Sequence, residues 1–234
     1  MFDSAALRAR LTGVRDRIAR AAGRAGRDPA SIRLVAVSKT FPSDHIRALA
    51  DTGQLDFGEN KVQEGLAKIE RTADLALRWH LIGYLQSNKA KHAPRFHVIH
   101  SIDSASLLRK VDAAATAAGR TVDVLLQIDL AREPTKHGVS PDGLTPILEI
   151  AKDCPSARVK GLMLLPPASE DPEATRPYFA AARALRTTLL TEGADPEMLS
   201  ELSMGMSHDF EVAVEEGATM VRVGSAIFGP RPAA

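Results

Sequence analysis

Short apolar runs alternate with longer segments of helical periodicity along the chain, and this alternation constrains the fold more than any other feature. Runs of about four to eight aliphatic and β-branched residues are typical of buried strands, whereas apolar residues spaced three and four apart indicate the buried face of a helix. The pattern predicts eight strands, at 34–39, 55–57, 79–82, 97–101, 121–128, 158–163, 199–204 and 219–223. Helices are expected near 43–53, 62–69, 86–92, 104–118, 141–151, 172–190 and 209–216, with a short final segment at 227–229.

Eight consecutive strand and helix units are what a (β/α)8 TIM barrel requires, so we expect this α/β architecture. A doubly wound open sheet would alternate in the same way, but the first strand-to-helix turn lacks the G-x-G-x-x-G pattern of dinucleotide sites. A helical stripe made by Leu7, Leu11, Val14 and Ile18 precedes the first strand and predicts an extra amino-terminal helix. Since no linker-like segment divides the sequence, residues 1–234 are expected to form a single domain.

Charge and cysteine content exclude several classes of function. The 30 basic and 29 acidic side chains leave a net charge of +1, which supplies no field to recruit nucleic acid or an anionic membrane. Cys154 is the only cysteine, which excludes an internal disulfide and cysteine-pair zinc sites and agrees with a reducing cytoplasm. Residues 1–11 carry charges where an export signal would be apolar, and no apolar stretch approaches the ~18 residues of a membrane-spanning helix. We therefore expect a cytoplasmic monomer with no nucleic-acid or membrane partner.

Lys39 is the first candidate for chemistry, because it ends the apolar run that begins at Leu34. Side chains alternate along a strand, so Val35, Val37 and Lys39 point to one face, which in a central strand is a packed interior. Burial lowers the pKa of an amine, and a neutral amine can attack an aldehyde to form a Schiff base. Barrel proteins place such groups at the carboxyl ends of their strands. This segment alone leaves open the other interpretation, a lysine that reaches solvent at a strand end.

Two loops have the residue types of a phosphate site. Residues 203–209 form a glycine-containing turn that enters a helix, where backbone N–H groups and the helix dipole favour an anion. In residues 222–226, Gly224 permits a close backbone approach and Ser225 adds a hydroxyl donor. In a barrel these loops follow strands seven and eight, the recurrent phosphate site of the fold, and closure places strand eight beside strand one. The combination with Lys39 predicts a small phosphorylated aldehyde as ligand.

Arg222 narrows the choice of aldehyde. Alternation turns Val221 and Val223 toward the helices and Arg222 toward the site, where a charged guanidinium needs an acceptor. A pyridine nitrogen would be such an acceptor. An ion pair with Glu59 or another carboxylate explains the residue type equally well.

Other polar residues stand near predicted strand ends. Asn60 and Asn88 are typical of helix entry, which we weigh slightly above ligand contact. His97 and His100 lie at odd spacing on one strand and face opposite sides, so no metal site is predicted. Four methionines are better explained by packing than as a set lining a cofactor: Met163, Met204, Met206 and Met220.

Seven segments carry a stronger signal together than any one of them does alone. They are 34–39 (LVAVSK), 57–60 (FGEN), 80–89 (HLIGYLQSNK), 136–138 (KHG), 161–163 (GLM), 202–207 (LSMGMS) and 222–229 (RVGSAIFG). In this order and spacing they resemble the YggS/PROSC family of pyridoxal 5′-phosphate (PLP) homeostasis proteins. The resemblance covers essentially the whole chain, while residues 132–135 and 164–167 depart from the family pattern.

The resemblance implies an alanine-racemase-like barrel that carries PLP as a Schiff base on Lys39. It also implies a protein that holds and delivers PLP, limits the free aldehyde, and affects vitamin B6 and amino-acid balance, with apo forms of PLP-dependent enzymes as partners. Carried over position by position, it places Ser207, Gly224 and Ser225 at the phosphate, Arg222 at the ring nitrogen, and Asn60 and Met163 around the ring.

Two observations favour binding over catalysis. A racemase of this type takes a second acid/base from a separate carboxyl-terminal β-domain, and the sequence ends at Ala234, so we expect none here. An arginine at the ring nitrogen does not readily give up a proton, which leaves the pyridine a weak electron sink. The alternative is a PLP-dependent enzyme with weak racemase or decarboxylase activity, or an unrelated Schiff-base aldolase. No role is assigned to His80, Asn88 or the segment Lys136-His137-Gly138.

Overall fold

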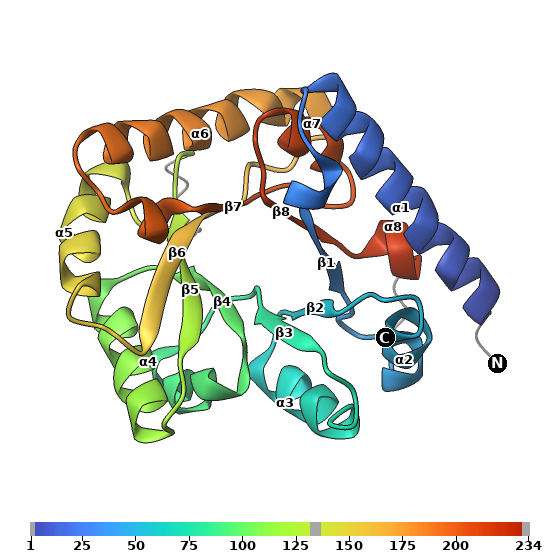
Figure 1. Cartoon of the computed structure of the whole chain (residues 1–234), viewed down its shortest axis with the longest axis horizontal. Helices are drawn as coiled ribbons and strands as arrows, with labels where there is room; N and C mark the ends of the chain where they lie inside the picture. The colour runs from blue at the N-terminus through green and yellow to red at the C-terminus, as the bar shows by residue number, and fades with distance from the viewer. Residues whose placement is uncertain (1–2, 132–136, 231–234) are drawn as a thin grey trace.

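Eight parallel strands close into a barrel in the order of the sequence (Figure 1). The computed structural model describes residues 3–131 and 137–230. Each predicted strand overlaps an observed one, and the (β/α)8 prediction is confirmed. The strands are β1 (Arg33–Val37), β2 (Asp56–Glu59), β3 (Arg78–Leu81), β4 (Val98–Ile102), β5 (Val122–Ile128), β6 (Ala157–Leu164), β7 (Glu201–Ser203) and β8 (Met220–Val223).

Pairing between the first and last strands closes the barrel. In the register of β1 and β8, Val35 lies opposite Arg222 and Ala36 lies opposite Val223. On its other side, β8 pairs with β7. The segments that follow β1 and β8 therefore leave the same end of the barrel as neighbours, as the sequence predicted.

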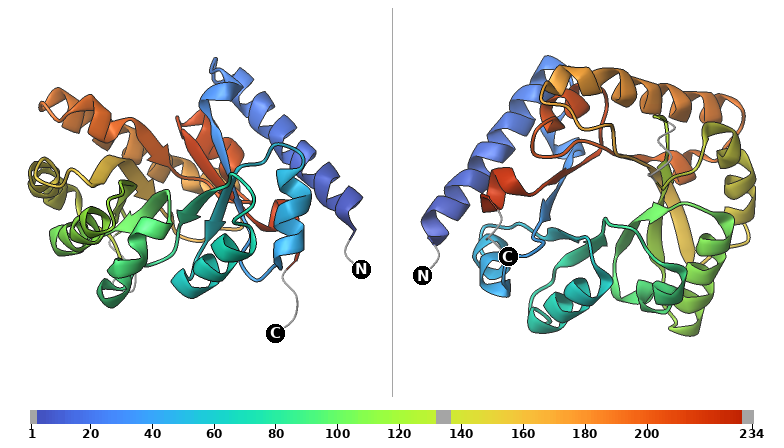
Figure 2. Two further views of the ribbon diagram at one scale, coloured as in Figure 1. Left: turned by 60° about the horizontal axis from the view of Figure 1, so that its bottom comes forward. Right: turned by 180° about the vertical axis from the view of Figure 1, so that it is seen from behind.

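Helices surround the barrel in both views of Figure 2. They are α2 (Ser43–Ala50), α3 (Val62–Arg71), α4 (Ala105–Ala117), α5 (Pro141–Ala151), α6 (Arg176–Thr191), α7 (Phe210–Glu215) and α8 (Ser225–Phe228), with 3₁₀ helices η1 (Pro29–Ser31), η2 (Ser87–Arg95), η3 (Pro172–Thr175) and η4 (Pro196–Leu199). The helix expected after β3 is the 3₁₀ helix η2, which contains Pro94, a residue without an N–H to donate to an α-helical ladder. Within the described ranges, no helix is long and apolar enough to cross a membrane.

The amino-terminal helix α1 (Ser4–Arg24) lies along the outside of the barrel, beside α8 (Figure 1). It packs against α2, α7 and α8. Its first turn is capped by Asp3, whose side chain accepts a hydrogen bond from the N–H of Ala6 at 3.0 Å. The predicted stripe from Leu7 to Ile18 is buried, so α1 covers the seam where β8 meets β1.

Alternation along the strands separates two apolar regions. Leu34 and Val223 belong to the larger core between the strands and the helices. Inside the barrel lies a smaller cluster, formed by Val98, Leu125, Met163 and Met220. Polar side chains share this interior, including His80, His100 and Ser203, each 0% exposed.

Gly161 of β6 pairs with Glu201 of β7, and a Cβ added at Gly161 would lie 1.9 Å from the carbonyl oxygen of Glu201. Gly161→Ala should therefore lower the free energy of unfolding by about 1–3 kcal/mol, because the strands must move apart. Gly13→Ala is the matched control, since a Cβ at this position in α1 meets no atom within 4 Å. It should raise the free energy of unfolding by about 1 kcal/mol. Urea unfolding measures both changes, and equal stability of Gly161→Ala and the parent protein would contradict this register.

Candidate functional site

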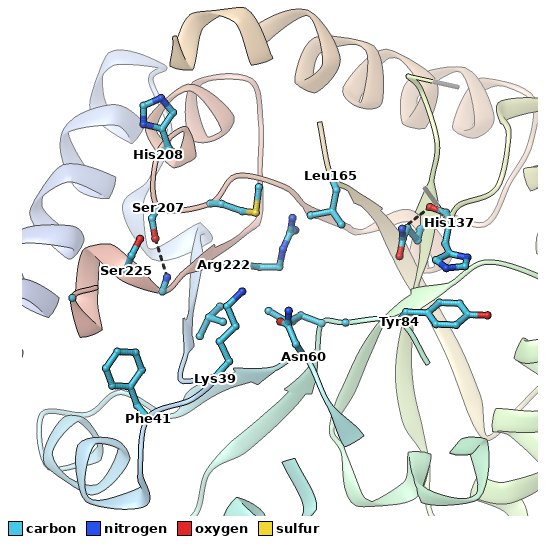
Figure 3. A pocket seen from close by; sticks show the side chains of 17 residues that line it. Lys39, Phe41, Asn60, Tyr84, His137, Leu165, Ser207, His208, Arg222 and Ser225 are labelled. Carbon is cyan, nitrogen blue, oxygen red and sulfur yellow. Dashed lines mark hydrogen bonds between the residues drawn. The ribbon is translucent and has the colours of Figure 1, made fainter. Parts of the chain in front are cut away.

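A cavity of about 530 Å³ opens at the carboxyl ends of the strands (Figure 3). It is formed by residues from several strands and the loops that follow them. Six of the seven residues predicted to contact a cofactor line it: Lys39, Asn60, Ser207, Arg222, Gly224 and Ser225. The sequence therefore predicted the position of the cavity and most of its polar wall.

Lys39 lies two residues beyond the end of β1, in a turn. Its side chain points into the cavity, toward Arg222 (Figure 3). The expected enclosure in a packed interior is wrong, because the strand ends at Val37 and Lys39 is only partly buried. The next residue, Thr40, has a φ of 70°, in the left-handed region where a β-branched residue is strained.

A buried group of charges holds the backbone of this turn. Nζ of Lys68 donates to the carbonyl oxygen of Ser38 at 2.8 Å. It also donates to Oε1 of Glu59 at 2.7 Å and to Oε1 of Glu64 at 2.8 Å. The hydroxyl of Ser38 donates to the same Glu59 oxygen at 2.6 Å. We call Lys68, Glu59 and Glu64 the Lys68 cluster.

The charges of the Lys68 cluster depend on one another. Burial raises the pKa of Glu59, against the effect of its contacts with Lys68. Burial alone would raise the pKa of Glu64, but hydrogen bonds from Lys68 and from the N–H of Thr40 outweigh it, so the net effect is a lowered pKa. The bond from Thr40 is 2.7 Å long. The strained turn after Lys39 is therefore held by side chains from β2 and α3, of which Glu59 and Lys68 are buried and Glu64 is half-buried.

Ser207 and the start of α8 form the side of the cavity next to β1. Oγ of Ser207 accepts the N–H groups of Gly224 at 3.0 Å and of Ala226 at 3.3 Å. A hydroxyl that accepts two hydrogen bonds keeps its own hydrogen to donate, and the hydroxyl of Ser225 lies on the same side (Figure 3). A Cβ on Gly224 would lie 3.4 Å from the carbonyl oxygen of Val37. Gly224 thus lies in contact with β1 and also lines the cavity.

The loop before α7 contributes fewer backbone donors than the sequence suggested. The N–H of Met206 donates to Oδ1 of Asp209 at 2.6 Å, so this donor is used within the loop. Burial raises the pKa of Asp209, and the bond from Met206 opposes it. The N–H of Met206 is therefore not offered to a ligand, whereas Ser207 lines the cavity.

Arg222 is 3% exposed and forms part of the cavity wall. Its Nη1 donates to Oγ of Ser203 at 2.7 Å and its Nη2 to the carbonyl oxygen of Leu164 at 2.9 Å. Burial lowers the pKa of Arg222 to about 10, with Asp209 opposing, so the guanidinium is charged at neutral pH. The ion pair with Glu59 that the sequence left open is not formed, because Glu59 belongs to the Lys68 cluster.

Other expectations need correction. Asn60 does not cap α3, because Lys61 is the residue before its first turn, and Asn60 lines the cavity instead. Met163, expected around the ring of a cofactor, is fully buried in the interior cluster, since it lies level with Ser203 on the neighbouring strand. Exposed Asn88 lies in η2, and His80 lies inside the barrel.

Tyr84 and His137 form the wall on the far side of the cavity from Ser207 (Figure 3). Their rings are stacked, with centroids 3.9 Å apart and planes 11° from parallel. The carbonyl oxygen of His137 accepts a hydrogen bond from Nε2 of Gln127 at 2.6 Å. Lys136 and residues 132–135 lie outside the described residues.

Sequence reasoning missed the Lys68 cluster. The buried residues of α3 are Val62, Gly65 and Lys68. The available signal was a lysine at helical spacing on an otherwise apolar face, nine residues after Glu59.

The cavity combines chemical groups that fit one kind of molecule. Lys39 supplies an amine, Ser207 and Ser225 supply hydroxyl donors, and Arg222 supplies a buried cation. A flat aldehyde with an anionic group at one end and a ring acceptor at the other matches this set.

Comparison with known proteins agrees with this chemistry. Residues 10–232 match the family model of the alanine racemase, N-terminal domain. The chain is 44% identical to the pyridoxal phosphate homeostasis protein of Aquifex aeolicus, over 95% of this chain and 97% of that protein. It is 40% identical to the protein of the same name from Pseudomonas aeruginosa, over 94% of each. The structure of PipY from Synechococcus elongatus with PLP bound is similar, with a TM-score of 0.84 and 39% identity, over 95% of this chain and 100% of that one.

Lys68→Met should lower the free energy of unfolding by about 3–5 kcal/mol, because it leaves Glu59 buried without its charged partner. Lys152→Met is the control. Lys152 pairs with Glu149 on the surface, with side chains 57% and 63% exposed, and its loss should change stability by at most about 1 kcal/mol. Denaturant unfolding of both variants measures the difference. Losses of the same small size would show that the Lys68 cluster does not hold the turn.

Proposed function

Because this chain belongs to the alanine racemase N-terminal domain family, and within it to the pyridoxal phosphate homeostasis proteins, we propose that it binds PLP as a Schiff base on Lys39. In this proposal one PLP-binding barrel, residues 1–234, supplies or buffers the cofactor. The observation that carries it is the convergence of Lys39, the serine hydroxyls and Arg222 on one cavity.

The proposed orientation follows from the positions of the polar groups. The phosphate lies against the hydroxyls of Ser207 and Ser225, beside the backbone at Gly224. The ring nitrogen faces Arg222, with Asn60 alongside the ring. Met163 supports the ring indirectly. Leu165 packs on the interior cluster that contains Met163, and Leu165 also lines the cavity.

Arg222 favours holding the cofactor over turning substrate into product. Its pKa of about 10 keeps it charged at neutral pH, so it donates a hydrogen bond to the ring nitrogen without passing on the proton. PLP supplies an electron sink when its ring nitrogen is protonated, and this arrangement leaves the nitrogen unprotonated. An unprotonated ring is a weaker electron sink, which disfavours racemisation and decarboxylation.

The partners in this proposal are apo forms of PLP-dependent enzymes, which would receive the cofactor from a monomeric carrier. We place the carrier in the cytoplasm, because its single cysteine, Cys154, is a buried thiol that suits a reducing compartment.

Purified protein loaded with PLP should show the absorbance band of a Schiff base, and Lys39→Ala should not, because it lacks the amine. Borohydride reduction followed by peptide mapping should place the adduct on Lys39 alone. Lys61→Ala is the control, since Lys61 lies close by at the start of α3 but does not line the cavity. A reduced adduct on Lys61, Lys89 or Lys136 would contradict the assignment of the Schiff base to Lys39.

The loaded protein should restore activity to an apo PLP-dependent enzyme, and Lys39→Ala should not, because it cannot retain its load. The same loaded protein should form no racemised or decarboxylated product from a panel of amino acids. Sustained turnover at about 1 s⁻¹ or faster, the low end of typical enzymes, would support the enzyme instead of the carrier. Failure to reactivate several apo-enzymes, with no turnover, would contradict delivery and leave a storage role.

A further inference from the structure

A continuous series of hydrogen bonds crosses the barrel interior and ends at Arg222. Asp56 Oδ1 lies 3.0 Å from Nε2 of His80, whose Nδ1 lies 2.9 Å from Nε2 of His100. Nδ1 of His100 lies 2.9 Å from Oγ of Ser203, which also accepts Nη1 of Arg222 at 2.7 Å. We call Asp56, His80, His100 and Ser203 the histidine chain. Its members come from β2, β3, β4 and β7, so it spans the barrel from one side to the other.

The far end of the histidine chain carries a negative charge. Nε of Arg78 donates to Oδ1 of Asp56 at 2.8 Å, and a second nitrogen of the same guanidinium donates to Oδ2. Burial acts against the charged form of Asp56, but hydrogen bonds from His80 and Arg78 outweigh it and lower its pKa to about 2. Asp56 is therefore a carboxylate at neutral pH, and it can only accept hydrogen bonds.

The two histidines are neutral. Burial lowers the pKa of His80, as do Arg33 and Arg78, while Asp56 raises it. Burial lowers the pKa of His100 still further, well below its usual value. The charged and titratable groups facing His100 all act in the same direction: His80, Arg222 and Arg33. Each ring therefore carries a single hydrogen, on one of its two nitrogens.

These charges fix the direction of every bond. Asp56 only accepts, so the hydrogen of His80 is on Nε2 and its Nδ1 accepts. The hydrogen of His100 must then be on Nε2, and its Nδ1 accepts in turn. The hydroxyl of Ser203 must donate to that nitrogen, which leaves the serine oxygen to accept from Arg222. All four hydrogen bonds point from Arg222 toward Asp56, and one tautomer of each histidine satisfies them.

We propose that the histidine chain is a positioning device for Arg222. By committing the Ser203 hydroxyl to His100, it presents the serine oxygen to Nη1, while the carbonyl oxygen of Leu164 holds Nη2. Two fixed contacts define the plane of a rigid guanidinium and direct its remaining N–H donors. The inference rests on the proposed function in one respect only, namely that the group which accepts from those donors is the ring nitrogen of PLP.

Packing alone does not account for these residues. The neighbouring interior is filled by apolar side chains, and buried imidazoles cost free energy unless each polar atom is hydrogen-bonded. In the histidine chain both nitrogens of both rings have a partner. A fully paired polar network specifies one arrangement of its members, which apolar packing does not do.

The first test needs no cofactor. Nitrogen-15 NMR of the cofactor-free protein, with the ring signals assigned through the backbone, should show His80 and His100 as neutral Nε2–H tautomers at neutral pH. A Nδ1–H tautomer or a protonated ring at either position would overturn the proposed direction. Because this measurement uses the parent protein, it tests the direction of the hydrogen bonds even where a variant does not fold.

The second test removes the acceptor. In Ser203→Ala, Nη1 of Arg222 loses its partner, so the guanidinium N–H signals, separate in the parent protein, should merge as the group rotates faster. Ser203→Thr keeps the hydroxyl and should keep them separate. Ser101→Ala is the matched control, because this buried serine of β4 donates to the carbonyl oxygen of Gly83, outside the histidine chain. Unchanged Arg222 signals in Ser203→Ala would refute positioning by Ser203.

The third test connects positioning to the ligand. Ser203→Ala should weaken PLP binding by about tenfold or more, since a hydrogen bond to a charged group is at stake. It should leave unchanged the affinity for a PLP analogue with carbon in place of the ring nitrogen. Equal losses for both ligands would overturn the link to the ring nitrogen. A parent protein that binds no PLP would refute the proposed function, while the two NMR tests would still decide the role of the histidine chain.

Discussion

Where β8 pairs with β1, a single register both closes the barrel and brings the functional groups together. Val35 lies opposite Arg222, so Lys39, two residues beyond the end of β1, emerges beside Gly224 and Ser225, which follow β8. A shift of one residue would turn Arg222 outward among the helices, because side chains alternate between the two faces. The apolar stripe of α1 covers this seam from outside, and its burial therefore stabilises the geometry of the site as well as the fold.

The site places several charges in largely buried positions, and each has local partners. Lys68 satisfies two carboxylates and the carbonyl oxygen of Ser38, so the same group that neutralises Glu59 also fixes the backbone before Lys39. Arg222 is compensated by neutral acceptors, and the nearest formal negative charge in its hydrogen-bonded series is Asp56, two imidazoles away. A carboxylate directly against Arg222 would compete with a ligand for the guanidinium. Neutral acceptors hold the guanidinium and leave its charge available to the cavity.

The sequence predicted what depends on periodicity and on strand ends. The eight units, the α1 stripe and the inward direction of Arg222 all follow from alternation within a single element. What it could not predict depends on contacts between elements. Whether Asn60 caps a helix or faces a cavity depends on where α3 starts, and Met163 is buried by the strand beside it. The partner of His100 comes from a segment far away in sequence, since His100 and Ser203 are 103 positions apart.

The direction of the histidine chain also bears on chemistry at the cavity. Its hydrogens all point away from the ligand, so the chain delivers no proton to the cavity unless both rings change tautomer. Arg222, which the chain holds at the cavity wall, keeps its own proton at neutral pH. This part of the wall therefore offers positive charge and hydrogen bonds without proton transfer. Under the proposed function, such a wall suits retention of PLP, for which the amine, the phosphate donors and an oriented cation suffice.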